Sequence, residues 1–290
     1  MSLVYVNGEF VDSEKASISV FDHGYLYGDG IFEGIRAYDG VIFKLDEHLK
    51  RLYSMAKALL IEMPITMDKM KEKVIEAVKI NSLKDAYIRL VVSRGKGDLG
   101  LDPYKCPKPT VVIIADKITL YPETMYKNGL KIITSTYRRN SIQALDPQIK
   151  SLNYLNNILA KIEAVKAGYP EALLLNQEGY VAECTGDNIF IISNGILFTP
   201  PSAVGSLGGI TRSTVIDIAK QLGIPFEEKF FSLFNVYTAD ECFLTGTAAE
   251  AIPVVEVDHR VIGDGVPGPI TNKIIEEFRK VTSILGTKVY

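Results

Sequence analysis

Short apolar segments joined by glycine-containing turns dominate the first 45 residues of the chain. Residues 3–11 predict two strands around Asn7-Gly8, a dipeptide typical of two-residue hairpin turns. Residues 30–43 predict a second pair around Asp39-Gly40. A chain that starts with paired strands must bury one face of a sheet, so its neighbouring segments have to supply the cover.

The following segments supply that cover. Residues 45–60 have helical periodicity, with apolar side chains recurring on one face. A second helix is predicted over residues 67–80, with Thr66 as its N-cap. Residues 86–93 and 110–115 predict buried strands. Together these segments predict an α+β domain.

The pattern weakens after this domain and then resumes. We expect domains at residues 1–116 and 129–290, joined by an interdomain loop at 117–128. In the second domain the sequence predicts strands over 130–135, 172–175, 180–183, 189–192, 196–198 and 241–244, and helices over 153–167, 211–222 and 270–285.

Composition limits the classes of function. The 290 residues are 47% apolar, which excludes intrinsic disorder, and a length of roughly 150 residues per domain suggests one or two domains. The chain has 32 Lys and Arg and 35 Asp and Glu, so its net charge is slightly negative and nucleic acid is not expected as a partner. No segment predicts a membrane span or signal peptide, and three isolated cysteines suggest a reducing compartment. We therefore expect a soluble cytoplasmic protein.

Two apparent motifs carry no chemistry. Residues 28–34 resemble a dinucleotide fingerprint, but the third glycine is one place late and a strand follows where a helix is needed. His23, His48 and His259 lack metal-ligand spacing and are expected in turns or on the surface. No metal site is predicted.

Two loops of small residues are suited to binding a phosphate. In the first, Gly208 and Gly209 precede a predicted helix, and Thr211 adds a hydroxyl donor at its start. Backbone N–H groups and the helix dipole favour an anion at such a position. The second loop spans residues 245–250. An ordinary glycine-rich loop explains either one alone, but two in one domain favour a phosphorylated cofactor.

Lys150 lies just before a predicted amphipathic helix. Its neighbours Ile149 and Leu152 are apolar, which suggests a partly desolvated amine suited to nucleophilic chemistry. Most lysines are solvated surface charges, so this position becomes specific only together with its surroundings.

Seven segments together resemble one family, the fold-type IV pyridoxal-phosphate enzymes, and within it the branched-chain amino acid aminotransferases. The order and spacing of the segments are the specific signal, and the resemblance covers nearly the whole chain. The segments span residues 21–36, 47–52, 86–89, 149–154, 183–190, 209–212 and 246–250.

The resemblance implies a mixed α/β (α+β) fold with a smaller N-terminal domain and a larger C-terminal pseudo-barrel domain. It implies that Lys150 is catalytic and forms the Schiff base with pyridoxal 5'-phosphate, and that Glu183 pairs with the pyridine nitrogen. The other implied cofactor ligands are Arg51, Tyr154, Leu207, Gly209, Ile210, Thr211 and Thr247.

The implied reaction transfers the amino group of leucine, isoleucine or valine to 2-oxoglutarate. Arg89 resembles the group that receives the distal carboxylate of glutamate, and Thr247 and Ala248 offer N–H groups to the α-carboxylate. The remaining implied substrate residues are Tyr27, Phe32, Gly34, Arg36 and Tyr87. The resemblance also implies a homodimer or larger homo-oligomer. With such a pocket, we expect residues 116–128 to form a mobile lid that covers it and becomes ordered when substrate binds.

Three alternatives remain open. A D-amino acid aminotransferase would share the lysine and phosphate segments, but its Arg-x-His trap is absent from residues 95–103. An aminodeoxychorismate lyase fits Tyr87-Ile88-Arg89 less well. A cofactor-binding regulator would not need both the pyridine carboxylate and the substrate groups.

Overall fold

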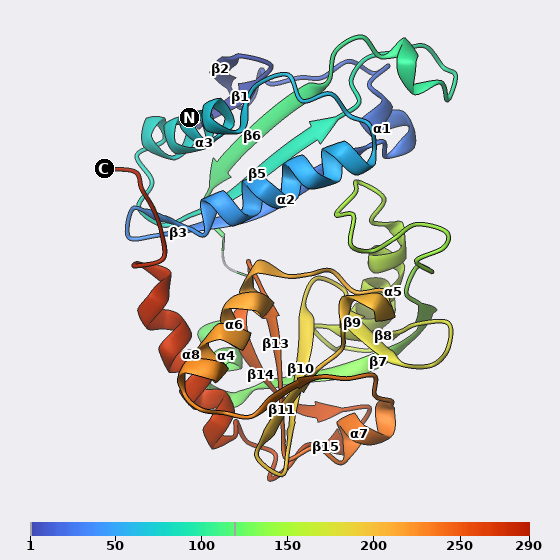
Figure 1. Cartoon of the computed structure of the whole chain (residues 1–290), viewed down its shortest axis with the longest axis vertical. Coiled ribbons are helices and arrows are strands. Elements are labelled where there is room, and N and C mark those ends of the chain that lie inside the picture. Colours follow the sequence, from blue (N-terminus) through green and yellow to red (C-terminus); the bar gives the residue numbers. More distant parts are fainter. Residues whose placement is uncertain (1, 119) are drawn as a thin grey trace. The chain divides into compact units, whose positions relative to one another are not determined.

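The computed structural model describes residues 2–118 and 120–290, which form two compact units (Figure 1). The first unit comprises residues 2–118, 150–153 and 281–290. The second comprises residues 120–149 and 154–280. The predicted mixed α/β class is confirmed, with a curled sheet in the second unit.

The first unit is built on a seven-stranded sheet with the order β16-β4-β3-β5-β6-β1-β2. Each described pairing in it is antiparallel. The strands are β1 (Leu3–Val6), β2 (Glu9–Asp12), β3 (Gly30–Tyr38), β4 (Val41–Phe43), β5 (Ala86–Ser93), β6 (Thr110–Asp116) and β16 (Gly286–Lys288). The helices are α1 (His23–Tyr27), α2 (Leu45–Ala58), α3 (Met67–Ile80) and the 3-10 turn η1 (Pro103–Lys105).

Local sequence explains the hairpins and helices of this unit. Val6 pairs with Glu9, so Asn7 and Gly8 are the two turn residues, and both have the positive φ that such a turn requires. The Thr66 side chain accepts a hydrogen bond from Lys69 N and caps α3 as predicted. A strand, β3, follows Gly28, which confirms that residues 28–34 are not a dinucleotide-binding motif.

The second unit is built on a nine-stranded mixed sheet with the order β12-β11-β10-β13-β14-β7-β8-β9, and β15 pairs with β14. The strands are β7 (Leu130–Arg138), β8 (Ala172–Leu175), β9 (Val181–Cys184), β10 (Asn188–Ser193), β11 (Ile196–Thr199), β12 (Phe226–Glu228), β13 (Glu241–Gly246), β14 (Glu250–Val257) and β15 (Arg260–Val261). The helices are α4 (Glu123–Asn128), α5 (Leu155–Lys166), α6 (Ile210–Gln221), α7 (Leu233–Tyr237), α8 (Pro269–Thr282) and the 3-10 turn η2 (Ser202–Val204).

The buried faces of these elements form the core of the second unit. Phe190 of β10 and Phe243 of β13 are both fully buried, and their rings stack at a centroid distance of 4.9 Å. On another part of the sheet, Ala160 and Ala164 of α5 pack against β8. Their small side chains let the helix approach the strand closely.

Tertiary pairing decided several elements that the sequence analysis missed. The strand β14 contains Pro253, which argues against a central strand because proline has no N–H to donate. Yet β14 lies between β13 and β7. Segments 150–153 and 281–290 join the first unit, whereas the predicted domains place them in the second; those predicted boundaries stay a prediction.

The predicted interdomain loop at 117–128 contains Thr119, which lies outside the described residues. The end of this segment, Glu123–Asn128, forms α4. Its Met125 and Tyr126 pack against the core of the second unit, as does the buried Tyr121. The proposed role of 117–128 in covering the pocket stays a prediction.

Two histidine expectations were wrong. His23 and His48 are both 1% exposed rather than on the surface. His48 is buried because it faces a buried carboxylate, as described below. None of the helices in the described part of the chain combines the length and apolar composition that a bilayer span needs.

The inward face of α2 provides a stability test. Leu49 is fully buried, so we expect Leu49→Ala to lower the free energy of unfolding by about 2–5 kcal/mol through lost burial and a cavity. Lys50 is exposed on the same helix and gives the matched control, Lys50→Ala. Urea unfolding measures both variants. Equal stability of the two would contradict this packing of α2.

Candidate active site

Lys150 is tied by its backbone to β3 of the first unit. Phe32 N donates to Lys150 O at 3.0 Å, and Leu152 N donates to Gly30 O at 2.9 Å. The Lys150 side chain is positioned by this pairing, and its Nζ lies 4.5 Å from the centroid of the Phe32 ring. The half-buried amine therefore projects over an aromatic side chain.

A buried carboxylate on this same strand, β3, holds Arg51. Glu33 of β3 is fully buried and accepts hydrogen bonds from Arg51 Nε and Nη2, each at 2.7 Å. His48 lies one turn before Arg51 on α2, and its Nδ1 is 2.7 Å from Glu33 Oε2. The two contacts to Arg51 are bidentate, the geometry that fixes a guanidinium most firmly.

Burial and the charges in this cluster shift the pKa values of Glu33 and His48. Burial alone would raise the pKa of Glu33, but the charge and hydrogen bonds of Arg51, with those of His48, lower it to about 2. Burial lowers the pKa of His48, despite the opposing effect of Glu33. A neutral His48 that donates from Nδ1 to the carboxylate fits both shifts.

Five predicted substrate residues lie on one face of paired strands. Phe32, Gly34 and Arg36 alternate along β3, where Gly34 pairs with Arg89 of β5 and Arg36 pairs with Tyr87. The Arg89 guanidinium carbon lies 4.3 Å from the centroid of the Phe32 ring. Two aromatic rings and two guanidinium groups thus share this face.

Gly34 is required by the approach of Tyr87. A Cβ built at Gly34 would lie 2.3 Å from the Tyr87 hydroxyl, so any side chain here would displace the phenol. Tyr27, the sixth predicted substrate residue, ends α1, and its hydroxyl donates to the backbone oxygen of Leu99. Its ring packs edge-on against that of His23 at the start of α1, with the centroids 5.0 Å apart. Tyr27 is therefore held by α1 and by Leu99 rather than by β3 or β5.

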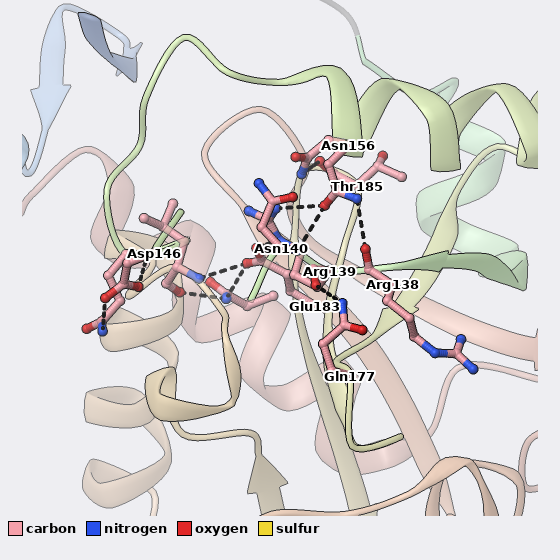
Figure 2. A network of polar contacts seen from close by, with 12 residues as sticks. Arg138, Arg139, Asn140, Asp146, Asn156, Gln177, Glu183 and Thr185 are labelled. Atoms are coloured by element: carbon pink, nitrogen blue, oxygen red, sulfur yellow. Dashed lines mark hydrogen bonds and ion pairs between the residues drawn. The ribbon is translucent and has the colours of Figure 1, made fainter. Parts of the chain in front are cut away.

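In the second unit, Glu183 is buried at the end of β9 and is paired with Arg139 (Figure 2). Glu183 Oε1 accepts from Arg139 Nε at 2.8 Å. Glu183 Oε2 accepts from Leu207 N at 2.9 Å and lies 3.5 Å from Asn188 Nδ2. A carboxylate has roughly four acceptor positions, so Glu183 retains capacity for a further donor.

The loop before α6 packs against the same residues. Asn188 Nδ2 donates to Leu207 O at 2.8 Å, and a Cβ at Gly209 would lie 2.2 Å from Asn188 Oδ1. Gly209 is the N-cap of α6, and no side chain caps the helix. Ile210 and the buried Thr211 form its first turn, where N–H groups lack intrahelical partners.

The turn between β13 and β14 lies beside this loop. Thr245 pairs with Asn188 in the sheet register, and Thr247 and Ala248 follow two and three residues later. A Cβ at Gly246 would lie 1.9 Å from Asp187 Oδ1, which shows how closely the turn packs on the start of β10. Strand pairing therefore brings the two predicted phosphate loops together.

Tyr154 lies at the start of α5 and accepts a hydrogen bond from Ile158 N at 2.9 Å through its backbone oxygen. Its side chain is half-buried. Asn156, two residues later, donates and accepts within the network around Arg139 (Figure 2). The helix start that carries Tyr154 thus also supports the Glu183 pair.

This donor set fits a phosphorylated pyridine cofactor. The uncapped start of α6 and the Thr211 hydroxyl suit a phosphate, and the ionisable Glu183 suits a protonated ring nitrogen. Two buried hydroxyls next to these residues, Ser206 and Thr245, have no hydrogen-bond partner in the described part of the chain. Unsatisfied buried groups of this kind are expected where a polar ligand binds.

Several residues of these clusters were missed by sequence reasoning. Glu33 and His48 lay within recognised segments but received no role. A glutamate inside the apolar strand 30–38 was the available signal for Glu33. Arg139, Asn156 and Asn188 gave no comparable signal, because their importance comes only from what they contact.

The low pKa of Glu33 predicts a pH-dependent stability. The Glu33 carboxylate stabilises the fold fully above its unfolded pKa of 4.5, and this contribution is lost as pH falls towards its folded pKa of about 2. The loss amounts to about 3 kcal/mol at 1.36 kcal/mol per pKa unit. Glu33→Gln should be less stable than wild type at pH 7, and the difference should shrink as pH falls below 4.5.

Urea unfolding at a series of pH values measures this difference. Glu62 is exposed and provides the control, Glu62→Gln, whose curve should run parallel to that of wild type. A constant gap between wild type and Glu33→Gln across the acid range would contradict the predicted ionisation of Glu33.

Similarity to known proteins agrees with these clusters. Residues 30–257 match the family described as amino-transferase class IV. A relative from Methanocaldococcus jannaschii, described as a putative branched-chain-amino-acid aminotransferase, is 54% identical over 287 residues, covering 99% of both chains.

The branched-chain aminotransferase from Thermoproteus uzoniensis with norvaline is 39% identical, with a TM-score of 0.94 over 100% of this chain and 99% of that chain. The branched-chain amino acid aminotransferase from Thermobaculum terrenum in its PLP-form is 31% identical, with a TM-score of 0.91 over 100% of this chain and 98% of that chain. The chain therefore belongs to the class IV amino-transferase family.

Proposed function

We propose that this protein transfers the amino group between branched-chain L-amino acids and 2-oxoglutarate, with pyridoxal 5'-phosphate as cofactor. The observation that carries the proposal is the buried Glu183, which lies against the loop that leads into the uncapped start of α6. A site for a ring nitrogen and a site for a phosphate are thus neighbours in one unit. The similar enzyme from Thermobaculum terrenum is in its PLP-form, which supports this assignment.

The proposed cofactor ligands have distinct tasks. Glu183 accepts a hydrogen bond from the protonated ring nitrogen, and Thr211 and the Ile210 N–H group bind the phosphate. Arg51 supplies a positive charge for the phosphate, with its orientation fixed by Glu33. The remaining proposed ligands are Tyr154, which bonds the ring oxygen, Leu207, which packs on the ring, and Gly209 and Thr247, which line the phosphate.

Lys150 is the proposed catalytic residue. When bound, pyridoxal phosphate withdraws electrons from the substrate and so makes its Cα proton acidic. Lys150 Nζ would take that proton from Cα as general base and, as general acid, would give it to the cofactor carbon. Its backbone is fixed on β3, so the amine moves only through its own side-chain torsions while it works.

The face of β3 and β5 is the proposed substrate pocket. Phe32 and Tyr87 give apolar walls for a branched side chain, and Gly34 leaves the room that Tyr87 occupies. Arg89 lies over Phe32 and meets the distal carboxylate of glutamate, so one pocket accepts both kinds of substrate. Arg36 and Tyr27 complete the proposed pocket, and Thr247 and Ala248 bind the α-carboxylate through N–H groups.

We also propose that the protein assembles as a homodimer or larger and works in the cytoplasm. Several large apolar side chains of the first unit are exposed, and self-association would cover them. They include Val20, Tyr25, Leu99, Leu101 and Tyr104.

Replacing the proposed catalytic lysine tests the chemistry. We expect Lys150→Ala to abolish the visible absorbance that purified protein acquires with pyridoxal phosphate, because no other amine replaces Nζ. Transamination should also fall by several orders of magnitude. Lys50→Ala, at an exposed lysine, is the control for both measurements. A Lys150→Ala variant that keeps wild-type absorbance and activity would refute the proposal.

A substrate panel tests the assigned pocket. Half-reactions with L-Leu, L-Ile, L-Val, L-Glu and D-Ala, followed by absorbance, should be fast for the L-substrates. Arg89→Ala should slow L-Glu about 10-fold or more beyond its effect on L-Leu, since only glutamate loses a charged hydrogen-bond partner. Equal losses for both would exclude this role of Arg89. Faster reaction of D-Ala than L-Leu would instead identify a D-amino acid aminotransferase.

A further inference from the structure

Arg139 is a buried arginine that sequence analysis did not single out. It follows β7 directly, and its guanidinium is 7% exposed, as is the carboxylate of Glu183. Removing both charges from water is costly unless they pair closely. Their contact, from Arg139 Nε to Glu183 Oε1 at 2.8 Å, meets that need.

The backbone of Arg139 is held on both sides. Arg139 N donates to Leu175 O at 2.8 Å, and Gln177 Nε2 approaches Arg139 O at 3.4 Å (Figure 2). Both partners come from β8 and the turn that follows it. The Cα of Arg139 is therefore fixed relative to the sheet that carries Glu183.

The far end of the side chain is held by Asn156. Arg139 Nη1 donates to Asn156 Oδ1 at 3.0 Å, and Asn140 N donates to the same oxygen at 3.2 Å. Asn156 Nδ2 in turn donates to Arg138 O at 2.8 Å. Because both ends of the amide are used, Asn156 has one orientation, and that orientation presents its oxygen to Arg139.

These contacts require an arginine in particular. Two donors of one rigid planar group reach two acceptors, a carboxylate and an amide oxygen, in different directions. A lysine ammonium would supply the charge but not the fixed fork. The arrangement thus fixes the angle of the Glu183 carboxylate.

We propose that Arg139 is a positioning residue for Glu183: oriented by Asn156, it holds the buried carboxylate turned to receive the ring nitrogen of the cofactor. This inference rests on the proposed function, because it gives Glu183 a bound pyridine ring to meet. The carboxylate is fixed through its two oxygens separately. Arg139 holds Oε1 and Leu207 N holds Oε2, so neither oxygen has to reorganise when the ring binds.

A double-mutant cycle measured by cofactor affinity tests this role. Apoprotein is titrated with pyridoxal phosphate for wild type, Arg139→Met, Glu183→Gln and the double variant. With Glu183 present, Arg139→Met should weaken binding of pyridoxal phosphate about 10-fold or more. Losses of this size are seen at metal sites when the residue that orients a ligand is removed. In the Glu183→Gln background it should change affinity less than about 2-fold, because Arg139 acts through Glu183.

Two further variants separate positioning from folding. Arg138 is exposed, and Figure 2 shows its side chain directed away from Glu183, so Arg138→Met is the matched loss of charge and should leave affinity unchanged. Arg139→Lys should recover part of the affinity by restoring the charge. If Arg139→Met is insoluble, the cycle is completed with Arg139→Lys, which should weaken binding only when Glu183 is present.

The outcomes are distinct. Equal loss of affinity from Arg139 variants in both backgrounds, or no loss in either, would overturn the positioning role while leaving the proposed function intact. If wild-type apoprotein does not bind pyridoxal phosphate, or Glu183→Gln binds it as well as wild type, the proposed cofactor site itself is wrong.

Discussion

A buried carboxylate paired with an arginine is the interaction on which the polar cluster of each unit depends. Glu33 holds Arg51 in the first unit, and Arg139 holds Glu183 in the second. Burying either carboxylate would be costly without the guanidinium beside it. The proposed roles within the two pairs are reversed. Glu33 orients the cofactor ligand Arg51, whereas Arg139 orients the cofactor ligand Glu183.

Backbone pairing between strands places the residues of the candidate site. The short segment at Lys150 adds to β3, whose next residues supply Phe32 and Glu33. In the second unit, the pairing of β10 with β13 sets Asn188 opposite Thr245, and this register brings the two predicted phosphate loops together. Strand ends thus gather groups from distant parts of the chain, and this is why a sheet supports such a site.

The proposed pocket explains how one site accepts two unlike side chains. Its face of β3 and β5 combines two aromatic rings with two arginines, and the Arg89 guanidinium lies over Phe32. Stacking keeps the cation over an apolar surface without burying it unpaired. We propose that a branched side chain contacts the rings and that a carboxylate reaches the guanidinium.

The sequence by itself determined the local elements and led to the proposed ligands. Periodicity and turn residues predicted α3 and β5 with the bounds observed, because such helices and strands depend on nearby residues. The ordered segments pointed to Lys150, Glu183 and the α6 start. Only the tertiary structure decided that Arg139 and Asn156 support Glu183, that His48 is buried, and that residues 286–288 pair with β4. These features depend on contacts between residues far apart in the chain, and no local pattern encodes which distant partner a buried charge or strand edge will meet.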